Sequence, residues 1–357
     1  MALFSRRSKD TGDQTDGESA PAADETVDDG ILEDAPAASE AESEDVPQVN
    51  ISVSAYRGVG ASSPGAAFGA QAAQAPPAQK MPPAEAPEPT ETVPGLRDNT
   101  LLRQSLQQLS EKPTGAELLD VLRQFLQNQV FLRVRGNARA LLSEGKELPL
   151  AVAKRGDDQY VLVYSSGATL QDAVRTDGES DTSAVGQPAL AILRHVLAGP
   201  YAGILVDGAS APARAVLPRS VIEPAVEQAD PQLRIKTLLA APRTDDTPRD
   251  VATAMTEAPM WVAVRQSGET GEGEQPRMGI AEARMADGQR LLEVYSHPLE
   301  IVARGRGDRP LPFTAAQLGK ALAEHPELNG VIIDGGGPWV VLDRDTLAPV
   351  LALADSA

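Results

Sequence analysis

The C-terminal part of the chain contains a glycine-rich stretch whose residue types could bind phosphate. "GVIIDGGGPWVVLD", from Gly330 to Asp343, places three consecutive glycines between two apolar runs. A P-loop needs the pattern GxxxxGK[ST] and a following helix, with lysine on the phosphates and a hydroxyl on Mg²⁺. Here Gly337 is followed by proline and tryptophan, and then by a strand-like apolar run. We therefore interpret the stretch as a turn between two strands, not as a nucleotide site.

An Asp-Gly pair occurs twice, each time at the end of an apolar run. "GILVDG" contains Asp207 and Gly208, and "GVIIDG" contains Asp334 and Gly335. In one interpretation the carboxylate accepts backbone N–H bonds in the turn while the glycine adopts a positive φ. In the other, the pair contacts a ligand or ion, together with the nearby Trp339. A lone aspartate is a weak signal for acid–base catalysis or metal binding. We favour the structural role and keep these five residues as ligand-binding candidates.

Serine and histidine side chains raise the question of hydrolysis. In each half of the chain a serine follows a Val-Tyr pair, and Ser296 is itself followed by His297. Ser166 takes the place of that histidine in the first half, so the Ser-His pair is not repeated. No G-x-S-x-G elbow surrounds either serine. A hydrolase that uses Ser296 with Asp207 and Asp334 is therefore the least favoured hypothesis. We expect no enzymatic activity and assign no catalytic residue.

Composition excludes several further classes of site. The chain of 357 residues contains no cysteine and only three histidines, which lie far apart in the sequence. Thiolate chemistry is excluded, and a histidine-rich metal centre is not expected. We therefore predict neither a metal nor a cofactor. The net charge of −19 disfavours binding to nucleic acid, where lysine and arginine must neutralise phosphates.

The length of the apolar runs and the N-terminal residues are used to predict the location of the protein. No run approaches the roughly 20 residues needed to span a bilayer. "MALFSRRSKD" at the N-terminus has basic residues but no apolar core behind them, unlike a secretory signal. We expect a cytoplasmic protein without membrane insertion. Abundant alanine, glycine and proline, with more arginine than lysine, are typical of high-GC bacteria.

Residues 1–97 have the composition of a disordered acidic tail. Alanine, proline, serine and acidic residues dominate, and little apolar surface is available for burial. One apolar island, "VNISVSAYRGVGA" at residues 49–61, alternates apolar and polar residues like a strand. Its side chains Val53, Tyr56 and Val59 are candidates for docking on a protein partner by strand addition. The alternatives are a stray strand-like segment and a segment that folds back on its own domain.

The folded part, residues 98–227 and 228–357, contains two tandem copies of one pattern. Residues 148–166 and 277–297 both describe a strand, a polar turn and a strand that ends in Val-Tyr-Ser. "GILVDGASAPARAVLPRSVIEPAV" likewise aligns with "GVIIDGGGPWVVLDRDTLAPVL", so that the two Asp-Gly pairs coincide. An internal repeat of this kind indicates two copies of one structural unit.

Each copy is predicted to contain helices, a strand, a β-hairpin, a short helix, a longer helix, two strands and a last helix. Asp98 is available as the cap of the first helix, and Thr114 and Glu117 are spaced as a capping box. Hairpins mixed with helices favour an α+β fold with a mixed, largely antiparallel sheet in each copy.

The first copy resembles the N-terminal domain of the bacterial SseB family. The resemblance rests on "PLAVAKRGDDQYVLVYSSGATL", on the strand "GILVDG" and on the element "VLPRSVI". It covers residues 98–227, and residues 228–355 are a more divergent version. The resemblance implies the α+β fold and a bacterial source. It supplies no catalytic residues that could be transferred to this chain.

Two functional hypotheses follow. The first is a non-catalytic interaction or regulatory protein, which presents the surfaces of its two copies and its tail to a protein partner. The second is a small-ligand-binding module at the interface between the copies, lined by the Asp-Gly turns, because such interfaces often form clefts.

Overall fold

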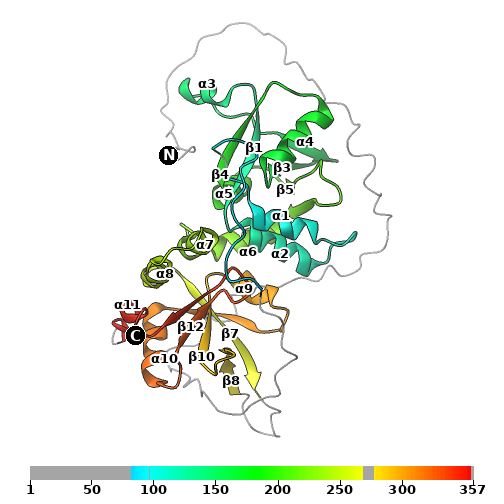
Figure 1. Cartoon of the computed structure of the whole chain (residues 1–357). Helices are drawn as coiled ribbons and strands as arrows, with labels where there is room; N and C mark the ends of the chain where they lie inside the picture. The colour runs from blue at the N-terminus through cyan, green and yellow to red at the C-terminus, as the bar shows by residue number, and fades with distance from the viewer. Residues whose placement is uncertain (1–81, 96, 268–276, 355–357) are drawn as a thin grey trace, which may run out of the picture. The chain divides into compact units, whose positions relative to one another are not determined.

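The computed structural model describes residues 82–95, 97–267 and 277–354, which contain two copies of one fold (Figure 1). The first copy consists of α1 (Thr100–Gln107), α2 (Gly115–Phe125), β1 (Gln129–Arg135), α3 (Ala138–Ser143), β2 (Val152–Arg155), β3 (Asp158–Tyr164), α4 (Gly167–Asp177), β4 (Thr182–Pro188), α5 (Ala189–Ala198), β5 (Gly203–Val206), β6 (Ala215–Pro218) and α6 (Arg219–Glu227). The second consists of α7 (Arg234–Ala240), α8 (Thr247–Met255), β7 (Met260–Ser267), β8 (Arg277–Ile280), β9 (Glu282–Arg284), β10 (Arg290–Tyr295), α9 (Pro298–Ala303), β11 (Arg309–Phe313), α10 (Ala315–Glu324), β12 (Gly330–Ile333), β13 (Val340–Asp343) and α11 (Ala348–Leu351). Among these described helices, none is long and apolar enough to cross a bilayer.

The two sheets have the same strand order. The first is β4-β1-β3-β5-β6, and the second is β11-β7-β10-β12-β13. In each sheet one central pair is parallel, β3 with β5 and β10 with β12, and the other pairs are antiparallel. The predicted α+β class with tandem, largely antiparallel sheets is confirmed. The outermost strands β4 and β11 were not predicted, since the sequence analysis placed two helices in succession there.

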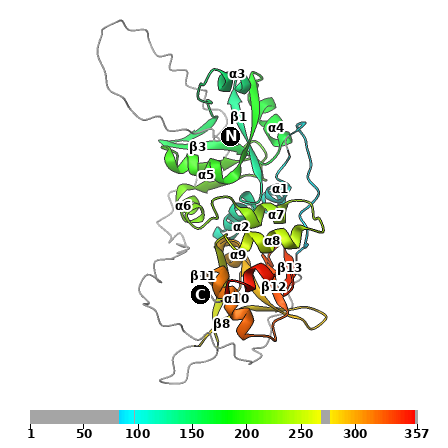
Figure 2. The same cartoon turned by 90° about the vertical axis from the view of Figure 1, so that its left-hand side faces the viewer.

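Alternation along the central strands gives each sheet two buried faces. In β1, Val130 and Leu132 join the main core with α2, α5 and α6, whereas Phe131 packs on the other face against α4. Figure 2 shows α4 and α5 on opposite sides of β1. In β7, Val262 and Trp261 divide between the two faces in the same way. Trp261 is buried.

A glycine and an arginine occur at equivalent positions in both copies. Close packing accounts for the glycine, and hydrogen bonds account for the arginine. A Cβ on Gly203 or Gly330 would lie 2.2 or 2.1 Å from the carbonyl oxygen of the neighbouring strand, so only glycine fits at the start of β5 and β12. Arg219 donates to the carbonyl of Val196 near the end of α5, and Arg344 donates to that of Leu322 near the end of α10 and to that of Leu328 after it. These arginines satisfy carbonyls that have no partner within their helix.

Of the two helix starts for which a cap was predicted above, that of α2 agrees with the sequence signal and that of α1 differs. The capping box of Thr114 with Glu117 is present at the start of α2. At α1, Asn99 is the N-cap, and its side chain accepts the N–H of Leu102. Asp98 was expected in that role, but its carboxylate bonds instead to the start of α4, as described below.

Part of the predicted tail packs against the folded copies. Residues 82–95, which we call the strap, were expected to be disordered because they are rich in proline, alanine and glutamate. The carbonyl of Pro82 instead accepts the indole N–H of Trp339 at 2.9 Å, and Thr92 accepts the N–H of Ala168 at 2.9 Å. These bonds use a backbone carbonyl and a threonine hydroxyl, which is why the composition does not reveal the contact. The island at residues 49–61, with its predicted docking residues, lies outside the described residues.

Candidate functional site

The two repeated aspartates lie at the ends of the parallel strand pairs. Asp207 follows β5 and Asp334 follows β12. Each carboxylate accepts two hydrogen bonds from a serine that follows the neighbouring strand. The backbone N–H of Ser165 lies 2.8 Å from one oxygen of Asp207 and its hydroxyl 2.5 Å from the other. Ser296 and Asp334 form the same two bonds at 2.8 and 2.5 Å. The carboxylate thus continues the parallel ladder beyond the last residue of the strand.

The backbone at these turns differs from the prediction in one respect. Asp207 and Asp334 themselves have positive φ values of 50° and 52°, whereas we expected the positive φ at the glycine that follows. Aspartate tolerates this region better than most residues because its short side chain can bond locally. The Asp207 N–H donates to the carbonyl of Val163, and the Asp334 N–H donates to that of Val294. Both aspartates are thereby held to the adjacent strand from backbone and side chain.

Burial makes both carboxylates poor partners for a dissolved ligand. Asp207 is 2 % exposed and Asp334 is 1 % exposed. Burial raises the pKa of Asp207, while its bonds from Ser165 oppose the increase. Burial, together with the negative Glu300 nearby, raises the pKa of Asp334 to about 6. The hydrogen bonds support the structural interpretation of the Asp-Gly pairs, and ligand binding by them stays a prediction.

The start of α4 in the first copy is covered by the chain itself. Ser166 caps this helix by accepting the N–H of Thr169. The Asp98 carboxylate accepts the Gly167 N–H at 3.0 Å and the Thr92 hydroxyl at 2.9 Å. Thr92 accepts the next helix N–H, as noted for the strap. A carboxylate and a hydroxyl are favourable here because the first N–H groups of a helix have no intrahelical acceptor.

The start of α9 in the second copy is covered by the first copy. His297 caps this helix, with Nδ1 accepting the N–H of Leu299 at 3.1 Å. Its Nε2 therefore carries the proton and donates to the carbonyl of Ala225 in α6, 2.9 Å away. Burial and the positive Lys236 lower the pKa of His297 to about 4. Both ring nitrogens are engaged away from Ser296, whose hydroxyl donates to Asp334. The geometry does not assemble the serine–histidine arrangement of a hydrolase.

A buried ionic cluster joins the two copies at the same place. Glu300, in the first turn of α9, is 0 % exposed and accepts from Lys236 of α7 and from Arg123 of α2. Arg123 donates at 3.0 Å to Glu300 and at 3.0 Å to the carbonyl of Gly337 in the glycine-rich turn. Gln127 also contacts Glu300, at 3.4 Å. Helix α2 of the first copy packs directly on α9 of the second.

The cluster was not predicted, and the sequence contains only a weak signal for it. Arg123 follows Leu122 on the apolar face of α2, and Lys236 follows Ile235 on that of α7. A cation on an apolar helix face is unusual, because burying a charge without a partner is costly. The signal identifies a buried cation. It does not identify Glu300 as the partner, because that residue lies 177 positions from Arg123.

The remaining predicted site residues have partners within the protein. The Gly335 carbonyl accepts from Arg304 at 2.7 Å, and the Gly208 carbonyl accepts from Arg214 at 3.3 Å. Trp339 is half-buried against the strap. The two Asp-Gly turns also have different neighbours, since only that of the second copy contacts Arg123. The glycine-rich stretch itself is the turn of the antiparallel β12–β13 hairpin, as predicted.

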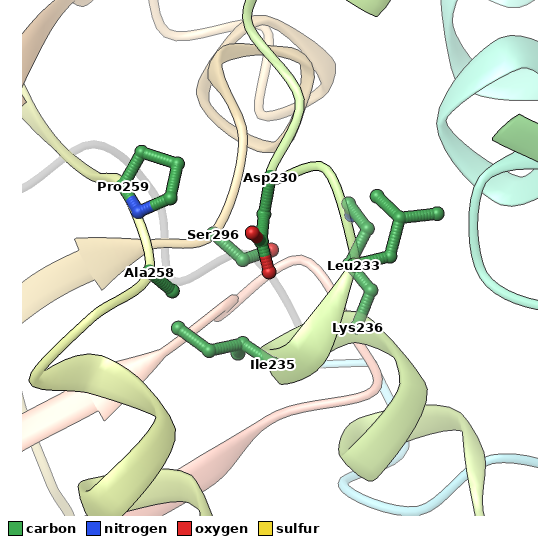
Figure 3. A pocket seen from close by; sticks show the side chains of 7 residues that line it. All are labelled: Asp230, Leu233, Ile235, Lys236, Ala258, Pro259 and Ser296. Carbon is green, nitrogen blue, oxygen red and sulfur yellow. The ribbon is translucent and has the colours of Figure 1, made fainter.

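The cavity beside Ser296 is too small for a metabolite. Its volume is about 10 Å³, roughly the space that one water molecule requires. In Figure 3 the Asp230 carboxylate and the Ser296 hydroxyl point into the same space. The lining residues are Asp230, Leu233, Ile235, Lys236, Ala258, Pro259 and Ser296. Within the described ranges there is also no group of three acidic or histidine side chains that could hold a metal ion.

Substitutions at Asp334 test the role of the carboxylate. We expect Asp334→Asn to change stability little at neutral pH, because asparagine tolerates positive φ and can bond to both Ser296 groups. Asp334→Ala leaves a buried N–H without an acceptor and places alanine at positive φ, which together cost about 2–5 kcal/mol. Urea unfolding measures both. The exposed Asp245→Ala serves as control, and equal stability of the Asn and Ala variants would contradict the assignment.

The pH dependence of stability separates Asp334 from His297. The raised pKa of Asp334 gives stability that is present below pH 4 and lost as pH rises through about 6. The lowered pKa of His297 gives stability that is present above about 6.5 and lost as pH falls towards 4. The two effects oppose each other between pH 4 and 6. We therefore expect the urea midpoint of Asp334→Asn to fall more steeply on acidification than that of the wild type. Parallel pH profiles would contradict this.

The ionic cluster predicts unequal costs for removing its members. Glu300→Ala leaves Arg123 and Lys236 buried without an anion, so we expect a loss of about 3–5 kcal/mol in the free energy of unfolding. Arg123→Ala costs less, because Lys236 still neutralises Glu300. The control is Arg135→Ala, which removes a largely exposed pair and costs less than about 1 kcal/mol. Calorimetry or urea unfolding gives these values, and a Glu300→Ala loss as small as the control would be incompatible with the cluster.

Comparison with known proteins agrees with the internal repeat. The model of the SseB protein N-terminal domain matches residues 102–223 and again residues 235–348. No curated protein and no solved structure matches the chain. The two matches together cover more than half of the sequence and coincide with the two sheets. The chain therefore belongs to the SseB family and carries two tandem copies of its N-terminal domain.

Proposed function

We propose that the chain is a non-catalytic interaction protein that recognises polypeptide through one repeated surface. We call this surface the strand-end face. It consists of the start of α4 or α9 together with the serine–aspartate pair at the ends of the parallel strands. Support comes from its neighbours in both copies, which are segments of polypeptide.

The two faces bind different kinds of segment. In the first copy, Thr92 and Asp98 supply a hydroxyl and a carboxylate to the N–H groups that begin α4. In the second copy, Ala225 of α6 supplies a carbonyl, and Arg123 of α2 supplies a cation. The face that meets an extended segment therefore offers helix N–H groups that Asp98 and Thr92 accept, and the face that meets a folded domain carries a glutamate.

Equivalent positions account for this difference. Ser166 and His297 are the N-caps of α4 and α9, and Thr169 and Glu300 lie three residues further on. A neutral serine and threonine leave a small uncharged surface, which suits a carboxylate from outside. Glu300 brings a negative charge that needs cations, and it obtains them from α7 and α2. The backbone is the same at the starts of α4 and α9. The side chains at the N-cap and three residues further on therefore decide which class of partner binds.

A regulatory role follows from the fact that the first face is covered by a segment of its own chain. The strap is linked covalently, so its effective concentration is in the millimolar range and it competes with any external segment. A partner that carries a carboxylate and a hydroxyl at the spacing of Asp98 and Thr92 would bind when Asp98 and the strap residue Thr92 detach from the start of α4. The strap ends at Gly95, shortly before α1, and its residue Thr92 lies at the start of α4, which it covers.

A labelled peptide of residues 82–98 tests whether the face binds polypeptide. The full chain with Thr92→Val and Asp98→Asn loses bonds that hold its own strap, so we expect saturable binding of the wild-type peptide to this variant. Binding to the wild-type chain is expected to be at least tenfold weaker, because its own strap competes. Fluorescence anisotropy measures both.

The control peptide carries the same two substitutions and is expected to bind neither protein. Absence of binding of the wild-type peptide to a variant that circular dichroism shows to be folded would contradict the proposal. A thermal-shift screen with nucleotides, amino acids and divalent ions addresses the small-ligand alternative. A compound that stabilises the wild type but not Asp334→Asn would favour that alternative instead.

A further inference from the structure

Among the strands that the structure describes, none pairs with the outer edge of β4 in the first copy. β4 is the last strand of its sheet and pairs with β1. Gly136 donates to the Asp181 carbonyl at 2.9 Å, which fixes the hydrogen-bonded positions of this antiparallel register. Bonded and non-bonded positions alternate along an antiparallel pair. Ser183 and Val185 therefore face β1 with their backbone groups, whereas Ala184 and Gly186 direct their N–H and C=O groups outward.

The equivalent edge of the second copy is blocked by proline. Pro310 and Pro312 lie opposite Ala263 and Trp261 of β7. Ala184 and Gly186 occupy the same register, opposite Arg133 and Phe131 of β1. Proline has no N–H to donate, and it is one of the devices that prevent pairing at sheet edges. In β4 the only proline is its last residue, Pro188, so the positions of Ala184 and Gly186 are not blocked, and the sequence "TSAVGQP" contains no charged residue.

A groove lies beside this edge on the α4 side of the sheet. It has a volume of about 380 Å³. Mostly apolar side chains line it, from the strap, from α4 and from β4: Val93, Leu170, Gln171, Val174, Arg175, Thr182 and Ala184. An added strand at the β4 edge would place every second side chain in this groove. The site therefore fits a segment that is apolar on one side only.

We propose that the island of this chain, residues 49–61, pairs with the β4 edge of its own first copy. Val49, Ile51 and Val53 alternate with Asn50 and Ser52, so an extended island has one apolar side. The apolar side fits the groove, and the polar side faces away from it. The segment contains no proline, and its backbone is able to pair with the outward groups of Ala184 and Gly186. The inference is independent of the strand-end face, which lies at the start of α4.

The covalent connection allows this pairing. Pro82 is the first described residue, and it is joined to Val93 of the groove by a stretch that spans at most about 40 Å. The connection from Ala61 to Pro82 spans up to about 70 Å when extended. The connection from Ala61 to Pro82 is therefore longer than the greatest possible distance between Pro82 and Val93, so the island is able to reach the β4 edge. The strap runs from Trp339 of the second copy, which Pro82 contacts, to the start of α4, where Thr92 accepts the N–H of Ala168.

Amide hydrogen exchange of the full chain tests the proposal. We expect the Ala184 and Gly186 amides to be protected in the wild type. In Val53→Pro, which removes a donor and disrupts strand pairing, both should exchange at least tenfold faster. Ala72→Pro, in the tail outside the island, is the matched control and should leave their exchange unchanged. Ala184→Pro copies Pro310 on the groove side, and should accelerate exchange of the Gly186 amide and of the island amides.

The same experiment gives the results that would overturn the proposal. Equal exchange of Ala184 and Gly186 in the wild type and in Val53→Pro would mean that the island does not cover the edge. Protection that grows with protein concentration, together with a dimer in light scattering, would mean that a second copy of the chain covers it. Melting temperatures of Val53→Pro and Ala184→Pro within a few degrees of the wild type show that the fold is intact.

Discussion

A buried carboxylate that bridges the ends of two parallel strands is the interaction on which each copy depends. The backbone ladder of β3 with β5, or of β10 with β12, ends where the chain must turn into a helix on one side and a hairpin on the other. Asp207 and Asp334 extend that ladder by accepting both the N–H and the hydroxyl of a serine. The serine is thereby fixed immediately before the N-cap residue of α4 or α9. The orientation of these helices, and of their free N–H groups, follows from the carboxylate.

The same construction gives the two copies different partners. Each helix start offers N–H groups that its own helix cannot satisfy. In the first copy the chain meets this need with Asp98 and Thr92, and in the second it uses His297 as cap and adds Glu300. Glu300 is tolerated in full burial because Lys236 and Arg123 neutralise it, and Arg123 belongs to the other copy. The ionic contact between the copies is therefore a consequence of a residue change at one helix start.

The repeated features were predictable because they are local in sequence. The Asp-Gly pairs, the hairpins and the capping box of Thr114 with Glu117 all have signatures within a few residues, and duplication made them easier to recognise. The edge strands were missed for physical reasons. β4 contains glycine and few apolar residues, and β11 carries Pro310 and Pro312, which normally argue against a strand. An edge strand needs only one set of backbone partners, so it tolerates both.

Contacts between residues that lie far apart in the sequence could not be predicted either. Nothing near Glu300 identifies Arg123 as its partner, and nothing in the composition of the strap shows that the Pro82 carbonyl meets the Trp339 indole. The positive φ was assigned to glycine because glycine adopts it most readily. In the structure the aspartate adopts it, since its carboxylate must turn back towards the neighbouring strand. Such assignments depend on which strands are adjacent, and that information lies in the fold.

The exchange rates of the Ser165 and Ser296 amides test the central role of the carboxylates most directly. Nuclear magnetic resonance of the wild-type protein measures both. If each N–H is held by a buried carboxylate, the two amides exchange as slowly as the central residues of β3 and β10, and only when the copy unfolds. Exchange of these amides at the rate of exposed loop residues would contradict the account, because the carboxylates would then be free to serve a ligand.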